Sequence, residues 1–331
     1  MIEADERLVI VVGAGASAEF GIPTGQKLVA DLRHGQIMRP SADRYNIFED
    51  TFDNFYEFVR KVKTNSLQTL NKFIHAAQAS PHNSIDLFAF HHPSFSDICK
   101  YYSAWGILKG HYRKANDADA GSNWQIRTDK WLLPNTTDGN QNWLGVLVLK
   151  YLEGSRKSNQ LRPETLTFVT FNYDRIIENA FRQFITQTEM FNDADEASIP
   201  KTLHVYGSFP ELPKEINNTD IFEAAANAIS YINDEKKPAD TIDEIRAKVR
   251  EATTIFFVGF DFDPLNVEYI ALNESAARKF ALAYDGNDRL VARMRKLNIS
   301  TDHIKAGSFD NPISIGLAAS RGFFDMANLI D

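Results

Sequence analysis

The chain has 331 residues, about twice the usual length of one domain, and its contents of 44% apolar and 24% charged residues are ordinary for a globular protein. Its formal net charge of −8 argues against a protein that coats nucleic-acid phosphates. Its single cysteine excludes an intramolecular disulfide and a zinc site built from several thiolates. The N-terminal apolar run is too short for a signal peptide or a membrane span, so we expect a cytoplasmic protein.

Four short apolar runs predict the strands of a parallel sheet. The first, Leu8 to Val12, is wholly aliphatic and stops at Gly13, which is typical of a strand buried on both faces. The other three runs have the same character: Leu166 to Phe171, Thr202 to Tyr206 and Thr253 to Val258. Apolar residues at helical spacing lie between them, over residues 176–184, 221–232 and 242–249. The alternation predicts an α/β fold with a Rossmann-like doubly wound parallel sheet.

Two further patterns concern the ends of these helices and the C-terminal part. Thr241 and Glu244 have capping-box spacing, which predicts that the third helix begins there, and residues 26–33 also have a helical pattern. From Arg289 on, the sequence predicts a helix, a short strand near His303 and a final helix.

The middle of the chain does not alternate between strand and helix. Residues 50–153 show one helical apolar pattern after another, and residues 115–142 within them are rich in Asn, Asp, Gly and Thr, which predicts a long polar loop. We therefore expect a Rossmann-like catalytic domain made of residues 1–35 and 154–331, with a large helical insertion at 36–153.

The glycine turn after the first strand is a candidate phosphate-binding site. Gly13, Ala14, Gly15 and Ser17 lead into a helical stretch, where glycines admit a ligand, the helix start offers unpaired N–H groups and Ser17 adds a hydroxyl. A tight structural turn explains the same residues. A dehydrogenase-type site would need a second strand ending in an acidic residue, and residues 26–33 predict a helix instead.

Five segments, in the same order along the chain, resemble motifs of the sirtuin family. Residues 13–25 (GAGASAEFGIPTG) resemble its opening motif, residues 170–174 (TFNYD) its T-x-N-x-D motif and residues 204–208 (HVYGS) its His-Gly segment. Residues 257–266 (FVGFDFDPLN) and 83–90 (NSIDLFAF) resemble segments of the bacterial sirtuin-like proteins of phage defence.

The resemblance implies an NAD+ hydrolase (NADase) that takes NAD as its substrate, releases nicotinamide and ADP-ribose, and depletes NAD in an abortive-infection type of antiviral defence. Protein deacylases of the family carry a four-cysteine zinc module, which a chain with Cys99 alone cannot build, so no structural zinc is expected. The residues expected to contact NAD lie in the matched motifs: Gly13, Ala14, Gly15, Ser17, Ile22, Pro23, Tyr206, Gly207, Gly259, Asp261 and Asp263.

Three residues are candidates for catalysis. Nicotinamide leaves a cationic pyridinium as a neutral molecule, so cleavage needs no general acid, only groups that hold the ribose and steer a water or hydroxyl. Asn172, just past a predicted strand, either orients that hydroxyl or water, or caps the next helix. His204 is either a general base or a structural strand residue. Asp174 either binds the nicotinamide amide, positions Asn172 or stabilises the helix start.

Two assignments stay open at this stage. In the family pattern histidine directly precedes glycine, whereas here Tyr206 precedes Gly207 and His204 lies two residues earlier. Alternation along a strand would put His204 and Tyr206 on one face, about 6–7 Å apart, so either is a candidate for the base. Asp261 and Asp263 either reach the ribose or Ser17, or are loop residues.

A toxic NADase needs control, and the chain has no evident sensor domain. We therefore expect a homo-oligomer regulated by a separate protein, such as a translocase-type ATPase or a short Argonaute, without direct nucleic-acid or membrane binding. The alternatives are a non-catalytic NAD or ADP-ribose sensor, an NAD-dependent protein deacylase and a dehydrogenase.

Overall fold

The structure is a computed structural model of the chain. It describes residues 7–34, 55, 59, 67–114, 124–126, 142–158, 161–187, 198–216, 220–231, 239–282 and 288–299. The chain divides into two compact units, and each is described by itself. Unit 1 contains Met1–Glu19, Thr128–Val205 and Lys237–Asp331, and unit 2 contains Phe20–Arg127 and Tyr206–Lys236.

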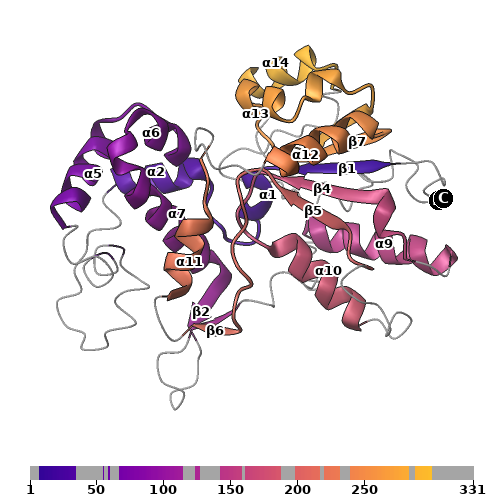
Figure 1. Ribbon diagram of the computed structural model, residues 1–331, viewed down its shortest axis with the longest axis horizontal. Coiled ribbons are helices and arrows are strands. Elements are labelled where there is room, and N and C mark those ends of the chain that lie inside the picture. Colours follow the sequence, from indigo (N-terminus) through magenta and orange to yellow (C-terminus); the bar gives the residue numbers. More distant parts are fainter. Residues whose placement is uncertain are drawn as a thin grey trace. The chain divides into compact units, whose positions relative to one another are not determined.

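Unit 1 is built on a five-stranded parallel sheet with the strand order β5-β4-β1-β7-β8 (Figure 1). Val12 at the end of β1 pairs with Thr170 of β4 and Val258 of β7, so the carboxyl ends of the three strands lie level. The strands are β1 (Leu8–Val12), β4 (Leu166–Thr170), β5 (Lys201–His204), β7 (Thr254–Val258) and β8 (Arg278–Leu282). This topology confirms the predicted Rossmann-like α/β fold.

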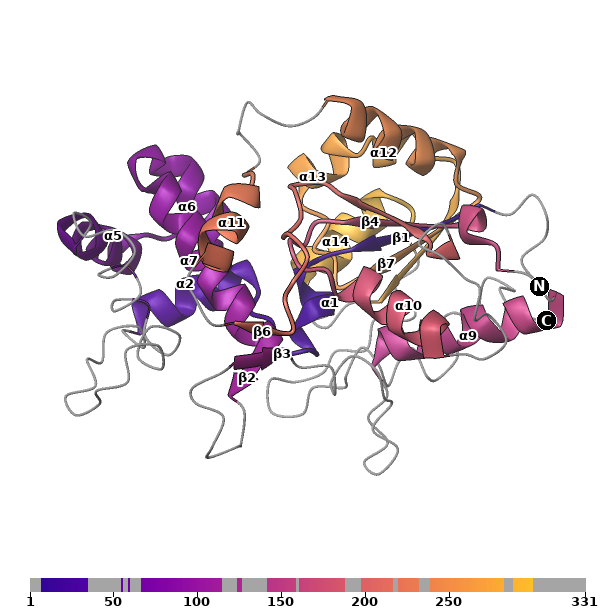
Figure 2. The ribbon, with the colours of Figure 1, turned by 60° about the horizontal axis from the view of Figure 1, so that its bottom comes forward.

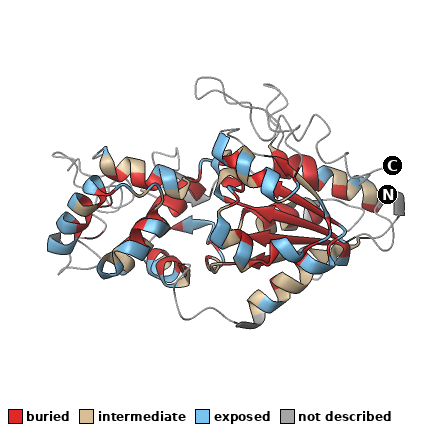
Figure 3. Cartoon of the chain, turned by 90° about the horizontal axis from the view of Figure 1, so that it is seen from above, coloured by how far each residue is buried: buried red, intermediate tan, exposed pale blue. Residues whose placement is uncertain are grey.

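Helices flank this sheet. The helices α9 (Trp143–Ser158) and α10 (Ile176–Gln187) lie on one side, and α12 (Ala239–Glu251) lies on the other (Figure 2). Every residue of β1, β4 and β7 is buried, as Figure 3 shows for the strands, which explains their unbroken apolar runs. The shorter helices of this unit are α1 (Ala14–Ala18), α13 (Pro264–Tyr269) and α14 (Asp288–Lys296).

Unit 2 is mainly helical in its described part. Its α11 packs on α7, and Phe55 packs on Tyr102 and Trp105 of α7. The short strands β2, β3 and β6 form an antiparallel sheet. The elements are α2 (Gly25–Arg33), α5 (Leu67–Ala79), α6 (Ile85–His91), α7 (Ser96–His111), β2 (Tyr112–Lys114), β3 (Trp124–Ile126), β6 (Glu215–Ile216) and α11 (Asp220–Ala228).

Most predicted elements are confirmed near their expected bounds, and two details are wrong. The helix predicted to begin at Thr241 begins at Ala239, before the capping-box residues. The strand predicted to reach Tyr206 ends at His204, because the chain turns there into Gly207, whose φ is +90°. Tyr206 therefore lies outside the described strand. The sequence did not predict β8 or the antiparallel sheet.

The boundaries of the two units differ from those of the predicted domains. The predicted Rossmann-like segment 1–35 contains α2, which belongs to unit 2, whereas the predicted insertion 36–153 contains most of α9, which belongs to unit 1. The polar loop predicted at 115–142 lies outside the described residues except for 124–126, which form β3, and residue 142. The strand predicted near His303 and the final helix also lie outside the described residues.

The turns after β1 and β7 are in backbone contact. The N–H of Gly13 donates to the carbonyl oxygen of Val258 (3.0 Å), and the N–H of Gly15 donates to that of Gly259 (3.1 Å). A Cβ atom at Gly13 would lie 2.5 Å from the Gly259 oxygen, and one at Gly259, where φ is +60°, would lie 2.1 Å from the nitrogen of Ala16. Neither position has room for a side chain. The connections from β1 and β7 run in opposite directions along the sheet, which makes this the switch point of the doubly wound fold.

Replacing Gly259 with alanine tests this close approach. We expect Gly259→Ala to lower the free energy of unfolding by about 2 kcal/mol or more, because the new methyl group meets backbone and the positive φ is strained. Urea and thermal unfolding measure the change.

Gly154→Ala in α9 is the matched control, since a Cβ atom there would meet nothing within 4 Å. It should leave stability unchanged or raise it by up to about 1 kcal/mol through helix propensity. Equal effects of the two substitutions would contradict the proposed packing of the turns.

Candidate functional site

Ser17, Asn172 and Asp174 form a buried, hydrogen-bonded cluster just beyond the carboxyl ends of β1 and β4. The side-chain nitrogen Nδ2 of Asn172 donates to Ser17 Oγ (2.8 Å) and to the carbonyl oxygen of Gly13 (3.1 Å). In turn Ser17 Oγ donates to Asp174 Oδ2 (2.8 Å). The cluster thus joins the GAGAS segment to the TFNYD segment.

The contact with Gly13 fixes the orientation of the Asn172 amide. A carbonyl oxygen only accepts hydrogen bonds, so the amide nitrogen must face it. No hydrogen bond from a described residue reaches Asn172 Oδ1. This oxygen can therefore accept a hydrogen bond from a ligand hydroxyl or a water.

Asp174 connects the cluster to the start of α10. Its Oδ1 accepts a hydrogen bond from the N–H of Ile176, the first residue of that helix (3.2 Å). Burial raises the pKa of Asp174, and the hydrogen bonds from Ser17 and Ile176 and the nearby His204 offset this only in part. Asp174 is thus connected to Asn172 through the Ser17 hydroxyl, and it also caps the first N–H group of α10.

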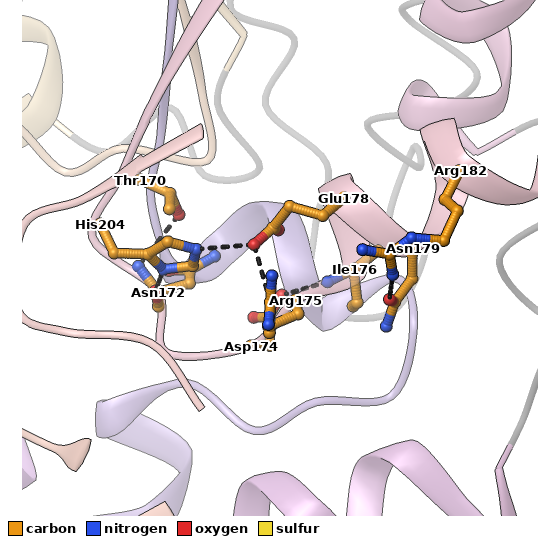
Figure 4. Close-up of polar contacts among 9 residues, drawn as sticks. All are labelled: Thr170, Asn172, Asp174, Arg175, Ile176, Glu178, Asn179, Arg182 and His204. Carbon is orange, nitrogen blue, oxygen red and sulfur yellow. Dashed lines mark hydrogen bonds and ion pairs between the residues drawn. The ribbon is translucent and has the colours of Figure 1, made fainter. Parts of the chain in front are cut away.

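His204 lies between Asn172 and Glu178, as Figure 4 shows. Its Nδ1 is 2.9 Å from the carbonyl oxygen of Asn172, and its Nε2 is 3.1 Å from Glu178 Oε1. The Nε of Arg175 also donates to Glu178 Oε1 (3.1 Å). Burial alone would raise the pKa of Glu178, but the hydrogen bond and charge of His204, aided by Arg175, hold it below its ordinary value.

The glycine turn uses several of its own donors within the protein. The N–H of Ala16 donates to the Gly13 carbonyl (3.0 Å), and those of Gly13 and Gly15 donate to the turn after β7. The turn therefore offers a ligand fewer backbone donors than its sequence pattern suggests. Ala14 is the exposed residue of the turn.

Asp261 and Asp263 have clear roles in the loop after β7. Asp261 Oδ1 accepts from the N–H of Asp263 (3.1 Å), and Asp263 Oδ1 accepts from that of Leu265 (3.0 Å) at the start of α13. Arg293 of α14 donates to the Asp261 carbonyl (2.9 Å) and to Asp263 Oδ2 (3.3 Å). Between them Phe262 is buried with a positive φ of 54°. These contacts of the two aspartates are those of loop residues, which was one of the alternatives, and the Ser17 hydroxyl donates to Asp174 instead.

Four of the residues expected to contact NAD lie in unit 2. Ile22 is buried and lies beside Gly110 of α7, where an added Cβ atom would come within 3.0 Å of the Ile22 Cα atom. Pro23 lies beside Gly106 of the same helix. Gly207, which follows Tyr206, approaches the carbonyl oxygen of Ala228 so closely that a Cβ atom there would be 2.3 Å from it. Within unit 2 Ile22, Pro23 and Gly207 pack closely, and the contact of all four residues with NAD stays a prediction.

Sequence analysis missed two residues beside the cluster. Glu178 lies four residues after Asp174, one turn along α10, so helical spacing was the signal that could have found it. Trp143, at the start of α9, is buried, and its Nε1 donates to the carbonyl oxygen of Ala16 (3.0 Å). No pattern in the sequence connects Trp143 to the glycine turn.

The described residues contain no group of three or more His, Cys, Asp or Glu side chains that could hold a metal ion. In the same part of the chain, no helix combines the length and apolar character needed to cross a bilayer. Cys99 is buried in α7, where burial raises the pKa of its thiol and keeps it protonated.

Replacing Asp174 with asparagine tests the electrostatics of the cluster. Since folding raises the pKa of Asp174, this group's contribution to stability is fully present below its unfolded pKa and is lost as the pH rises through its folded pKa. The asparagine side chain of Asp174→Asn does not ionise, so this variant does not lose stability in this way as the pH rises. We expect its Tm at about pH 7.5 to equal or exceed that of the wild type, with the gap closing toward about pH 4.

Asp174→Ala is the comparison variant, because it leaves Ser17 and the N–H of Ile176 without this partner, whereas asparagine keeps an acceptor for Ile176 and can donate to Ser17. It should lower the free energy of unfolding by about 1–3 kcal/mol. An asparagine variant as unstable as the alanine variant at neutral pH would show that the buried charge costs the protein nothing.

Comparisons with known proteins give limited information on this site. No protein-family model and no curated protein sequence matches the chain. Among solved structures, it is similar to Sir2Tm bound to a propionylated peptide (12% identity, TM-score 0.40, covering 98% of this chain and 95% of that one). It is also similar to Sir2 with a p53 peptide and NAD+ (11%, TM-score 0.39, 99% and 96%) and to a Sir2 homologue with ADP-ribose (13%, TM-score 0.39, 100% and 96%). Similarity at this level establishes neither the family of the chain nor its ligand or activity.

Proposed function

We propose that the chain is an NAD+ hydrolase that cleaves the bond between nicotinamide and ribose. The observation that carries the proposal is the cluster of Ser17, Asn172 and Asp174. It joins two of the segments that resemble sirtuin motifs, next to the switch point where open α/β sheets bind their ligands. Both the resemblance and the geometry therefore point to the same few residues.

The proposed reaction requires mainly that the protein hold the ribose and the attacking water in position. In the proposed reaction the bond from ribose C1′ to nitrogen breaks, and its electron pair passes to the pyridinium ring, so nicotinamide leaves neutral. The oxygen of a water forms the new bond to C1′, and one proton is released. Asn172 Oδ1 is suited to accept a hydrogen bond from the ribose hydroxyl or this water, while Ser17 and the Gly13 carbonyl hold the amide still.

The pyrophosphate is expected near the glycine turn. Because the N–H groups of Gly13, Gly15 and Ala16 bond within the protein, we assign the approach of the phosphates to the exposed Ala14 side of the turn. The contacts of Ile22, Pro23, Tyr206 and Gly207 with NAD stay predictions.

The biological setting forms a further part of the proposal. An enzyme that destroys NAD in an antiviral, abortive-infection response requires control, so we propose a homo-oligomer that a separate partner protein activates. Light scattering of the purified chain, alone and with the product of a neighbouring gene, tests both associations.

A non-catalytic NAD or ADP-ribose sensor is the second candidate function. The observation that favours it is the state of His204, whose two ring nitrogens both face oxygen atoms of the protein. A sensor would use the same cluster to bind the ribose without activating a water.

One assay separates these functions. The purified chain, alone and with its proposed partner, is incubated with NAD+, and free nicotinamide is followed by chromatography. Release of nicotinamide without an acyl peptide supports the hydrolase. Binding without release supports the sensor, release that depends on an acyl peptide supports a deacylase, and absorbance of the reduced cofactor supports a dehydrogenase.

Asn172→Ala tests the role of the cluster in this reaction. We expect nicotinamide release to fall by about 100-fold or more, because the group that orients the reacting oxygen is lost. Asn179→Ala is the matched control: Asn179 lies on α10, and its side-chain oxygen accepts a hydrogen bond from Arg182 (3.2 Å). That variant should keep wild-type activity. Full activity of a folded Asn172→Ala protein would refute the assignment.

A further inference from the structure

The surroundings of His204 are inconsistent with a free general base. Its Nδ1 faces the carbonyl oxygen of Asn172, and its Nε2 faces the carboxylate of Glu178. A base needs a ring nitrogen with an open lone pair directed at the substrate or a water. In this arrangement the protein occupies both nitrogens.

The same contacts determine the protonation of the ring. The Asn172 carbonyl only accepts, so Nδ1 carries a hydrogen. Nε2 faces a carboxylate oxygen of Glu178 that also accepts a hydrogen bond from Arg175. With an acceptor at each nitrogen, the ring satisfies both contacts only when both nitrogens carry hydrogens. The pair is largely shielded from water, with the His204 side chain 9% and the Glu178 side chain 12% exposed.

The described charged groups near the ring favour this form. Glu178 and Arg175 come from α10 and the turn before it, and Asp174 lies close enough to the ring for the two charges to interact. Two acidic groups therefore interact with the ring, and the basic group beside them, Arg175, is itself paired with Glu178.

We propose that His204 is a positioning residue, held as an imidazolium between the Asn172 carbonyl and its counter-ion Glu178. The inference that it serves catalysis rests on the proposed function, whereas its protonation and pairing do not. The donor at Nδ1 fixes the carbonyl of Asn172, and Thr170 Oγ1 accepts from the backbone N–H of Asn172 (3.1 Å). With its side-chain nitrogen bound to Gly13 and Ser17, Asn172 is held on all sides but Oδ1.

Histidine-selective NMR tests the pairing without any enzyme activity. Long-range 1H–15N spectra of the full chain, with His204 assigned from the spectrum of His204→Asn, should show both ring nitrogens protonated at neutral pH. Glu178→Gln should convert the ring to a neutral form that keeps its hydrogen on Nδ1. A neutral ring in the wild type, or a ring unchanged by Glu178→Gln, would overturn the proposal.

Nicotinamide release then separates positioning from base catalysis. The amide nitrogen of asparagine can replace Nδ1 as a donor but cannot act as a base, so His204→Asn should stay within about tenfold of the wild type, while His204→Ala loses clearly more. If His204 were the base, both variants would lose about 100-fold or more. If no variant or wild-type protein releases nicotinamide, the proposed hydrolase fails, and the NMR result alone decides the role of His204.

Discussion

The backbone contact between the turns after β1 and β7 is the constraint on which the candidate site depends. Gly13, Gly15 and Gly259 lie where an added Cβ atom would meet backbone. Their contact holds the ends of two central strands at the switch point of the sheet. It also fixes the Gly13 carbonyl, which in turn orients the Asn172 amide. The glycine motif is thus first a packing requirement, and any ligand role is built on it.

From that contact a chain of polar groups extends through unit 1. The Asn172 amide binds Ser17, Ser17 binds Asp174, and the Asn172 carbonyl lies against His204, which pairs with Glu178. Each group is buried or nearly so, and a buried polar group without a partner is costly, so the network holds its members in one arrangement. Such rigidity suits a reaction whose leaving group departs unaided, because the protein has mainly to hold the ribose and the attacking oxygen.

The fold and the position of Asn172 at the end of a strand were predictable from the sequence because the signals there are local. The strand β1 is apolar throughout, being buried on both faces, and Asn172 lies where a parallel strand ends. The strand β8 was not predicted because it begins with Arg278 and Lys279, which interrupt its apolar pattern at the edge of the sheet. The pairing of β3 with β6 joins residues that are far apart in the sequence, and no local sequence pattern predicts it. Glu178 looked like an ordinary charge on an amphipathic helix, since its partner His204 comes from a strand far along the chain.

Binding of ADP-ribose tests the central claim most directly, because this product can be titrated without turnover. Isothermal titration calorimetry should show one site per chain for the wild type and for Gly154→Ala, and an affinity about tenfold weaker for Ser17→Ala, since the hydroxyl that links Asn172 to Asp174 is lost. Absence of binding to the wild type, or equal affinity for Ser17→Ala, would contradict a nucleotide site built on this cluster.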